Sequence, residues 1–340
     1  PAVNQWSVKA SMPTARRGAK LVLLQGKVWA IGGYTHTYSH RVEIYDVANN
    51  TWSAGPTLST ARHYASAWVS NGRIFVAGGA GTAGSYHSSI EVFDTDSNQW
   101  TGSGNLPENN HYGDATTLDQ KVYLVAGWTA PNTATAKVFA ADLPAPAMHL
   151  YFKDGNATAE AAISPALDGN VTLNMLAPDA LAKLDVNRTH AQSAGSVIAV
   201  PRGSQPPPGY SLYKRSDRNS SLVWEEKAPV SVARAVFKGS AYLDEKIYLF
   251  GGQNSSYTSL DNLDSYDPLT NNWSQLEPMS VARSGLASSV LEGKIYAIGG
   301  QGLPSVEAYD PSTNTWSSRQ ALPSEVNHSA AVSFEGKIYL

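Results

Sequence analysis

The sequence predicts an all-β fold in which small antiparallel sheets of one design are repeated around an axis. Two observations predict it: a Gly-Gly pair that recurs at near-fixed spacing, and short apolar runs separated by turn residues. The second glycine recurs after 46 residues in the first part of the chain (33 to 79) and after 48 in the last part (252 to 300). A repeat of roughly 40–50 residues is typical of propellers and solenoids.

Each repeat carries one signature, which is a Gly-Gly pair, then an aromatic residue followed by Asp, then a Trp. The signature residues are Gly32, Gly33, Tyr45 and Trp52; Gly78, Gly79, Phe93 and Trp100; Gly251, Gly252, Tyr266 and Trp273; and Gly299, Gly300, Tyr309 and Trp316. The Asp residues recur with the aromatic residues, so we interpret them as turn formers rather than catalysts.

The first repeat justifies four strands in order. Residues 21–24 form a nearly continuous apolar run, which is typical of an inner strand buried on both faces. The turn Gln25-Gly26 leads into a second apolar run at 27–31, which ends at the Gly-Gly pair. Residues 41–45 alternate as a half-exposed third strand, and Trp52 lies on an outermost strand, where its indole can fill the wedge between sheets. Such sheets bury both faces by stacking radially.

This Gly-Gly, Tyr and Trp pattern resembles the kelch repeat family over about three-quarters of the chain. The resemblance implies a β-propeller of four-stranded antiparallel blades. A weaker copy at residues 121–127 carries Ala126 in place of the first glycine, and a last copy reaches only residues 335–340. The chain opens on Asn4-Gln5-Trp6-Ser7, which fits an outer strand. We therefore expect both ends to close one blade, with six blades in total.

A segment of different character interrupts the repeats. It contains two copies of a 14-residue unit (154–167 and 168–181), rich in Ala, Asp and Asn, which cannot build a globular core. The units resemble stalk segments of trimeric fibre proteins, and a solvated loop is the alternative interpretation. Two architectures fit: one six-bladed propeller with a stalk-like insertion in its third blade, or two half-propellers joined by a stalk.

The predicted organisation has three parts. Residues 1–140 hold an outer strand and three repeats, residues 141–222 form the stalk-like insertion or linker, and residues 223–340 hold two complete repeats and a truncated third. The net charge of −3 and the absence of basic runs argue against nucleic acid. No apolar run reaches the length of a bilayer span, and we expect no membrane span. The chain has no cysteine, which removes disulfides, thiolate metal sites and cysteine nucleophiles.

Eight Asn-x-Ser/Thr triplets are candidate N-glycosylation sites if the protein is secreted. They are Asn49, Asn156, Asn170, Asn187, Asn219, Asn254, Asn272 and Asn327. Both 14-residue units place their Asn-x-Thr identically, which favours an extracellular or cell-surface location.

Basic residues recur in the loops that join one blade to the next, and they form a candidate ligand-binding face. These residues are Arg16, Arg17, Arg62, His63, His111, Arg234 and Arg283. One interpretation is a ring for an anionic ligand, such as an acidic peptide or a sugar carboxylate. The other is that each Arg braces its own loop by hydrogen-bonding to nearby carbonyls, which the recurrence favours.

Nothing in the sequence points to a catalytic residue. His36 and His40 are four residues apart but lie in a polar loop, so metal ligation is not favoured. Radical-copper oxidases resemble the chain in blade pattern, but they need a Cys cross-linked to Tyr, which the chain lacks. Sialic-acid mutarotases share the six-bladed pattern, with no further motif to carry over. Kelch domains of ubiquitin-ligase adaptors, which bind acidic peptides, are a third resemblance.

The sequence thus predicts a non-catalytic extracellular scaffold for adhesion or fibre assembly, without cofactor or metal ion. Its propeller would present a binding surface to a protein or glycan partner, and the insertion would act as a tether. We also expect self-assembly. The alternatives are a carbohydrate-active kelch enzyme, such as a sialic-acid mutarotase, and an acidic-peptide-binding kelch module.

Overall fold

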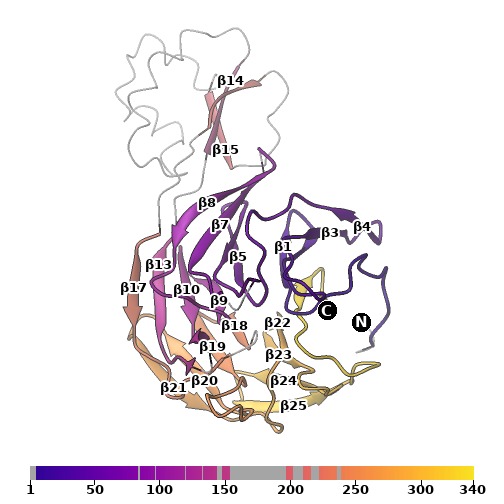
Figure 1. Ribbon diagram of the computed structural model, residues 1–340, viewed down its shortest axis with the longest axis vertical. Helices are drawn as coiled ribbons and strands as arrows, with labels where there is room; N and C mark the ends of the chain where they lie inside the picture. Colours follow the sequence, from indigo (N-terminus) through magenta and orange to yellow (C-terminus); the bar gives the residue numbers. More distant parts are fainter. Residues whose placement is uncertain are drawn as a thin grey trace. The chain divides into compact units, whose positions relative to one another are not determined.

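A computed structural model describes residues 5–82, 85–95, 97–118, 120–131, 133–143, 148–153, 197–201, 210–215, 222–235 and 239–340 (Figure 1). The chain divides into two compact units. The first comprises Pro1–Leu143 and Ser221–Leu340, and the second comprises Pro144–Ser220. Among the described residues, no helix has the length and hydropathy needed to cross a lipid bilayer.

The described residues of the first unit form five four-stranded antiparallel sheets, which we number as blades one to five (Figure 1). Blade one contains β1 (Lys20–Leu24), β2 (Lys27–Ile31), β3 (Val42–Asp46) and β4 (Thr51–Ala54); blade two contains β5 (Ser66–Ser70), β6 (Arg73–Ala77), β7 (Ser89–Asp94) and β8 (Gln99–Asn105). Blade three contains β9 (Asp114–Leu118), β10 (Lys121–Val125), β13 (Val138–Asp142) and β17 (Trp224–Lys227). Blade four contains β18 (Ser240–Leu243), β19 (Lys246–Phe250), β20 (Leu263–Asp267) and β21 (Asn272–Leu276); blade five contains β22 (Ala287–Leu291), β23 (Lys294–Ile298), β24 (Val306–Asp310) and β25 (Thr315–Arg319).

The prediction of six four-stranded blades was wrong, because the described residues form five. In place of the sixth, the described residues form a two-stranded sheet, β26 (Val332–Phe334) and β27 (Lys337–Tyr339), because the sequence carries no third-strand pattern to extend it. Trp6 nevertheless takes the position of a fourth-strand tryptophan. Its indole Nε1–H donates to the carbonyl of Gln320 at 3.0 Å, as Trp52 donates to Ala10 at 2.8 Å.

Neighbouring blades share apolar cores, and these cores decide between the two architectures. Val125 and Val138 of blade three pack in one cluster with Ile247 and Tyr266 of blade four. The two halves of the repeat pattern therefore lie in one ring of blades, and not in two half-propellers. Within blades one, two, four and five the tryptophan of the fourth strand pairs with the third-strand aromatic, as in the Tyr45↔Trp52 pair.

The Gly-Gly pairs lie where the backbone of one blade meets that of the next. Gly32 and Gly33 have φ angles of 66° and 108°, which favour glycine. A Cβ on Gly32 would stand 2.4 Å from the carbonyl oxygen of Arg62, and the N–H of Gly33 donates to that same oxygen at 2.9 Å. The second glycine of the pair thus joins blade one to the loop that enters blade two.

The second unit interrupts blade three between its third and fourth strands. The chain leaves after β13 and returns as β17, which pairs with it in the register Ala141↔Trp224. The described residues of the second unit form a three-stranded antiparallel sheet in the order β15-β14-β16, from Val197–Pro201, Met148–Lys153 and Tyr210–Arg215. Both 14-residue units lie outside the described residues, so the stalk remains a prediction. A short hairpin, β11 (Trp128–Ala130) with β12 (Thr133–Ala134), extends the loop between β10 and β13.

Candidate functional site

Four of the predicted basic residues are braces inside the blades. The guanidinium groups of Arg16, Arg62, Arg234 and Arg283 are fully buried, and each forms an ion pair with an acidic residue on the third strand of its own blade. The acidic partners are Glu43, Glu91, Asp264 and Glu307. These arginines are therefore not exposed to a ligand, and their position favours the bracing interpretation.

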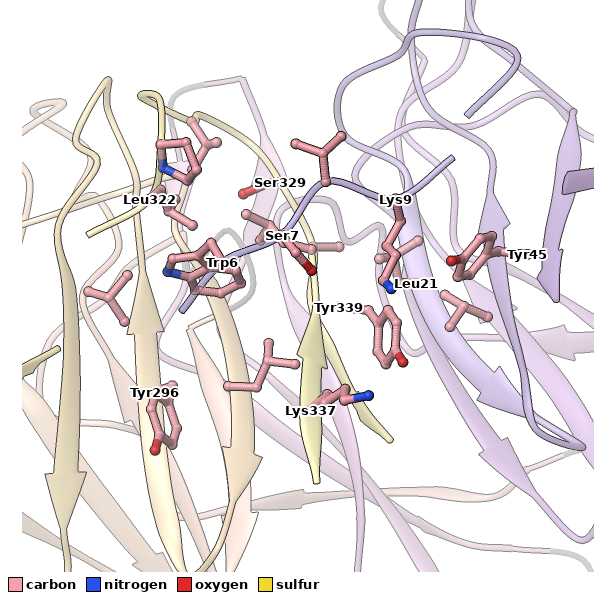
Figure 2. A pocket seen from close by; sticks show the side chains of 18 of the residues that line it. Trp6, Ser7, Lys9, Leu21, Tyr45, Tyr296, Leu322, Ser329, Lys337 and Tyr339 are labelled. Atoms are coloured by element: carbon pink, nitrogen blue, oxygen red, sulfur yellow. The ribbon is translucent and has the colours of Figure 1, made fainter. Parts of the chain in front are cut away.

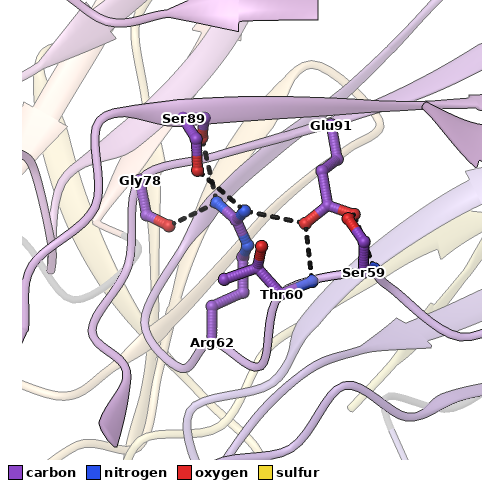
Figure 3. A network of polar contacts seen from close by, with 6 residues as sticks. All are labelled: Ser59, Thr60, Arg62, Gly78, Ser89 and Glu91. Atoms are coloured by element: carbon purple, nitrogen blue, oxygen red, sulfur yellow. Dashed lines mark hydrogen bonds and ion pairs between the residues drawn. The ribbon is translucent and has the colours of Figure 1, made fainter. Parts of the chain in front are cut away.

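Blade two illustrates the brace (Figure 3). Arg62 donates to the carbonyls of Gly78 and Ser89 at 2.8 and 2.9 Å and to the carboxylate of Glu91 at 2.8 Å. The N–H and hydroxyl of Ser59 donate to the other carboxylate oxygen of Glu91 at 2.7 and 2.6 Å. Burial lowers the pKa of Arg62 and the charge of Glu91 opposes this shift, so the guanidinium stays charged. One side chain thereby joins the entry loop, the first glycine and the third strand.

The sequence analysis did not identify the acidic partners, although their signal is visible. An acidic residue recurs two positions before the third-strand aromatic wherever the loop carries the Arg, as Glu43 does before Tyr45. Blade three lacks both partners together. Asn110 stands at the Arg position and donates its amide to the carbonyl of Ala126 at 2.8 Å, and Phe139 stands at the acidic position.

The remaining three predicted residues, Arg17, His63 and His111, belong to a cluster of aromatic rings. We call this set the aromatic cluster: Arg17, Tyr34, Tyr38, His63, Tyr64, Tyr86, His111, Tyr112, Trp128, Tyr257 and His328. Consecutive rings lie at centroid distances of 4.0 to 6.4 Å. All of them lie in loops between strands two and three or between blades, which share one end of the antiparallel sheets.

Backbone hydrogen bonds connect the inner residues of this cluster from blade to blade. The N–H of Tyr64 donates to Gly18 O at 2.9 Å, Tyr112 N–H donates to Tyr64 O at 3.1 Å, and His328 N–H donates to Gly285 O at 2.8 Å. Tyr64, Tyr112 and His328 have φ angles of 51°, 58° and 56°, a region that favours glycine. Gly18 and Gly285 hold the equivalent positions of two other blades with a φ of 65° each, so this conformation belongs to the repeat.

Burial sets the protonation of the cluster. It lowers the pKa of His111 to about 4 and lowers that of His63. It also raises the pKa of Tyr64 and Tyr112, whose hydroxyls share a hydrogen bond. At neutral pH both imidazoles and both phenols are therefore uncharged. Arg17 is exposed, and its guanidinium carbon lies 5.2 Å from the centre of the Tyr34 ring.

A cavity of about 980 Å³ lies elsewhere, between β27 and the segment that carries Trp6 (Figure 2). Tyr296 of blade five and Tyr339 of β27 line it. The ring of Tyr309, on the third strand of blade five, lies 6.1 Å from the ring of a second-strand tyrosine in blade four. Tyr296 is the second-strand tyrosine of blade five, and no third-strand aromatic ring packs against it among the described residues. The cavity adjoins the two-stranded sheet β26–β27, and among the described residues only His328 belongs both to its lining and to the aromatic cluster.

The candidate N-glycosylation sites differ in exposure, and half of them lie outside the described residues. Asn49 and Asn272 are exposed, and Asn327 is exposed although its Oδ1 accepts the N–H of Gln301. The Oδ1 of Asn254 accepts two backbone N–H groups of its own loop. The other four triplets, at Asn156, Asn170, Asn187 and Asn219, lie outside the described residues. Over the part of the chain that the structure describes, no group of three His, Asp or Glu side chains is placed to hold a metal ion.

The Kelch motif family matches this chain at residues 15–59, 61–107, 234–280 and 282–323. These segments include the four complete signatures and omit blade three, where Ala126 and Phe139 depart from the pattern. Together they amount to more than half of the chain.

Individual relatives are similar over shorter segments. Kelch-like protein 36 from Bos taurus is 36% identical over 83 residues, which are 23% of this chain and 13% of that protein. Alpha-scruin from Limulus polyphemus is 31% identical over 88 residues, 24% of this chain and 10% of that protein. Kelch-like ECH-associated protein 1A from Danio rerio is 38% identical over 65 residues, 18% of this chain and 11% of that protein. The chain thus spans only a small part of the curated relatives that it matches.

A solved structure, "Structure of YjhT", is similar in fold. The similarity has a TM-score of 0.62 and covers 93% of this chain and 88% of the other, at 14% sequence identity. At this level of identity the likeness concerns the fold alone.

Proposed function

The chain belongs to the kelch-repeat family, and we propose on this premise that its propeller is a non-catalytic scaffold that holds the aromatic cluster as a binding surface. The observation that carries the proposal is the contrast between two sets of basic residues. The four buried arginines brace the blades through their ion pairs, and exposed Arg17, exposed Tyr257 and half-buried Tyr86 lie in loops at one end. Binding residues are often carried on loops that a rigid scaffold positions.

A protein or glycan partner fits this surface better than a small metabolite. Aromatic residues and Arg are enriched where proteins bind other molecules. One relative, Kelch-like ECH-associated protein 1A, is named for an association with another protein. The test is retention of the purified chain on peptide and glycan arrays, with Tyr257→Ala as the variant and Tyr242→Ala, an exposed tyrosine outside the cluster, as the matched control. Retention lost in Y257A alone supports the proposal, and retention equal in all three proteins contradicts it.

We further propose that the scaffold acts outside the cell, in adhesion or fibre assembly, with the second unit as a tether. Support comes from the Asn-x-Ser/Thr triplets, of which Asn49 and Asn272 are exposed in the first unit. Intact-mass analysis of native material tests this, because N-glycans add sugar-sized increments. Peptide mapping assigns the increments, and unmodified peptides at Asn49, Asn272 and the repeat triplets Asn156 and Asn170 would contradict the glycoprotein proposal.

A carbohydrate-active enzyme, such as a sialic-acid mutarotase, is the second candidate, and the exposed guanidinium of Arg17 beside His63 favours it. Anomer exchange of sialic acid followed by NMR discriminates the two. The scaffold proposal predicts no acceleration by the purified chain. Acceleration that disappears in Arg17→Ala would establish the enzyme instead.

A further inference from the structure

The aromatic cluster carries little positive charge, contrary to what its sequence suggests. Of the seven basic residues expected at this end of the propeller, four are neutralised by buried carboxylates. His63 and His111 are uncharged at neutral pH because burial lowers the pKa of both imidazoles. Arg17 alone among the seven is an exposed cation. Within the cluster, a ligand whose recognition depends on several negative charges would find one counter-charge, Arg17, with the exposed Arg41 in the same loop as Tyr38.

The two imidazoles are oriented as hydrogen-bond acceptors. The Nδ1 of His63 lies 3.1 Å from the carbonyl of Ala80, and the Nδ1 of His111 lies 3.0 Å from the carbonyl of Trp128. A carbonyl accepts only, so each Nδ1 carries the proton and donates it. In the neutral ring the other nitrogen, Nε2, then keeps its lone pair. The side chain of His63 is only half-buried, so its Nε2 can accept from a ligand hydroxyl, whereas His111 is 3% exposed and its imidazole is packed inside the cluster.

The rings around these imidazoles offer flat apolar faces. Tyr34, Tyr38, Tyr86 and Tyr112 are half-buried, and the side chain of Tyr257 is 52% exposed. The Trp128 indole is buried among them, in edge-on contact with His111 and Tyr257, and its Nε1–H has no partner among the described residues. The negative face of an aromatic ring attracts the weakly positive C–H groups of an apolar surface. The exposed ring faces beside the neutral acceptor of His63 match a polyhydroxylated ring.

We propose that the aromatic cluster binds neutral carbohydrate, with the tyrosine rings stacking on sugar rings and the Nε2 atom of His63 accepting a sugar hydroxyl. The inference rests on the proposed binding function and names its ligand class. Arg17 lies at the edge of the surface, over Tyr34, where it donates hydrogen bonds to hydroxyl or ring oxygens without requiring a carboxylate.

The experiment is titration of the purified chain with neutral cello-, manno-, galacto- and chito-oligosaccharides, and in parallel with sialylated and uronic-acid oligosaccharides and an acidic peptide. A neutral sugar is expected to bind with an affinity that stays constant when salt is raised, because no ion pair is screened. Tyr86→Ala and Tyr257→Ala are each expected to weaken binding by about tenfold through the loss of a stacking face. Tyr242→Ala, outside the cluster, is the matched control and should bind as the unmodified chain does.

His63→Phe keeps an aromatic ring and removes the acceptor, so it should weaken neutral sugars while leaving the circular dichroism spectrum unchanged. Three results would overturn the inference. Binding of only the acidic peptide or the acidic sugars, with strong salt dependence, would be compatible with the scaffold function but would reject neutral carbohydrate as the ligand class. Binding of a neutral sugar that Y86A, Y257A and H63F leave intact would reject the site. If no sugar binds while a protein partner binds at Tyr257, carbohydrate would be rejected as the ligand and the scaffold proposal would still hold.

Discussion

Blades two and three are neighbours of one repeat design, and they differ where the design is braced. Blade two joins its entry loop to its third strand through the buried Arg62–Glu91 pair, whereas blade three has Asn110 and Phe139 at the same positions. Blade two passes from β7 to β8 by a tight turn, and blade three accommodates the second unit between β13 and β17. Both keep four strands, and the Phe93↔Trp100 pair of blade two corresponds to Ala141↔Trp224 in blade three, so the sheet tolerates the loss of its ion pair when both partners are replaced.

The largest expected effect is that of removing one half of the brace. Arg62→Ala leaves Glu91 buried without its counter-charge, and breaking such a pair typically costs about 3–5 kcal/mol. The double variant R62N/E91F copies blade three and is expected to cost only about 2 kcal/mol, because no buried charge is left unpaired. Chemical denaturation of the three proteins measures the difference. A double variant no more stable than R62A would show that Asn110 and Phe139 do not substitute for the ion pair.

The next largest effect is the pH dependence of stability that the buried imidazole of His111 causes. Its folded pKa of about 4 lies below the ordinary value of 6.5, so between these values the unfolded state binds more protons. Its contribution therefore leaves stability unchanged above pH 6.5 and lowers it as pH falls toward 4, by on the order of 3 kcal/mol. Thermal melts from pH 7 to pH 4 should fall less steeply in His111→Gln than in the unmodified chain. His40→Gln, an exposed histidine, is the control, and an equal slope in H111Q would contradict the buried, neutral assignment.

The smallest effect concerns the outer-strand tryptophans of the same two blades. The Nε1–H of Trp100 donates to the carbonyl of Pro56 at 2.8 Å, whereas the buried Nε1–H of Trp224 has no partner among the described residues. Trp100→Phe should therefore cost about 1 kcal/mol more than Trp224→Phe, which is the net value of one hydrogen bond. Equal losses in denaturation would indicate that packing alone accounts for both indoles.

Much of the fold follows from the repeat, because each signature residue has a local physical role that repeats with it. The Gly-Gly pair, the third-strand aromatic and the outer Trp predict strand order and blade contacts without knowledge of the rest of the chain. The sixth blade could not be predicted in the same way. Asn4-Gln5-Trp6 and residues 335–340 match the pattern at two strands, and a sheet is completed only by the strand between them.

The candidate site was harder to predict than the fold. The recurrent Arg suggested an exposed ring of charge, because the sequence does not show that Glu43 and its equivalents face the same arginines across the blade. Nor does it show that Tyr64, Tyr112 and His328, which lie in three separate loops, are linked by backbone hydrogen bonds, His328 through Gly18. A residue's burial depends on the closed ring of blades. Repeat position alone therefore could not distinguish Arg16, whose side chain is buried, from the next residue, Arg17, which is exposed.

The central claim is that the partner binds at the end of the blades that carries the aromatic cluster. Hydrogen–deuterium exchange with and without a saturating ligand from the arrays tests it most directly. We expect slower amide exchange at residues 63–65, 111–113 and 327–329, and no change in the turns between third and fourth strands at 46–50, 94–98 and 267–271, which lie at the opposite end of the sheets. Protection confined to those turns would place the partner at the other end and contradict the account.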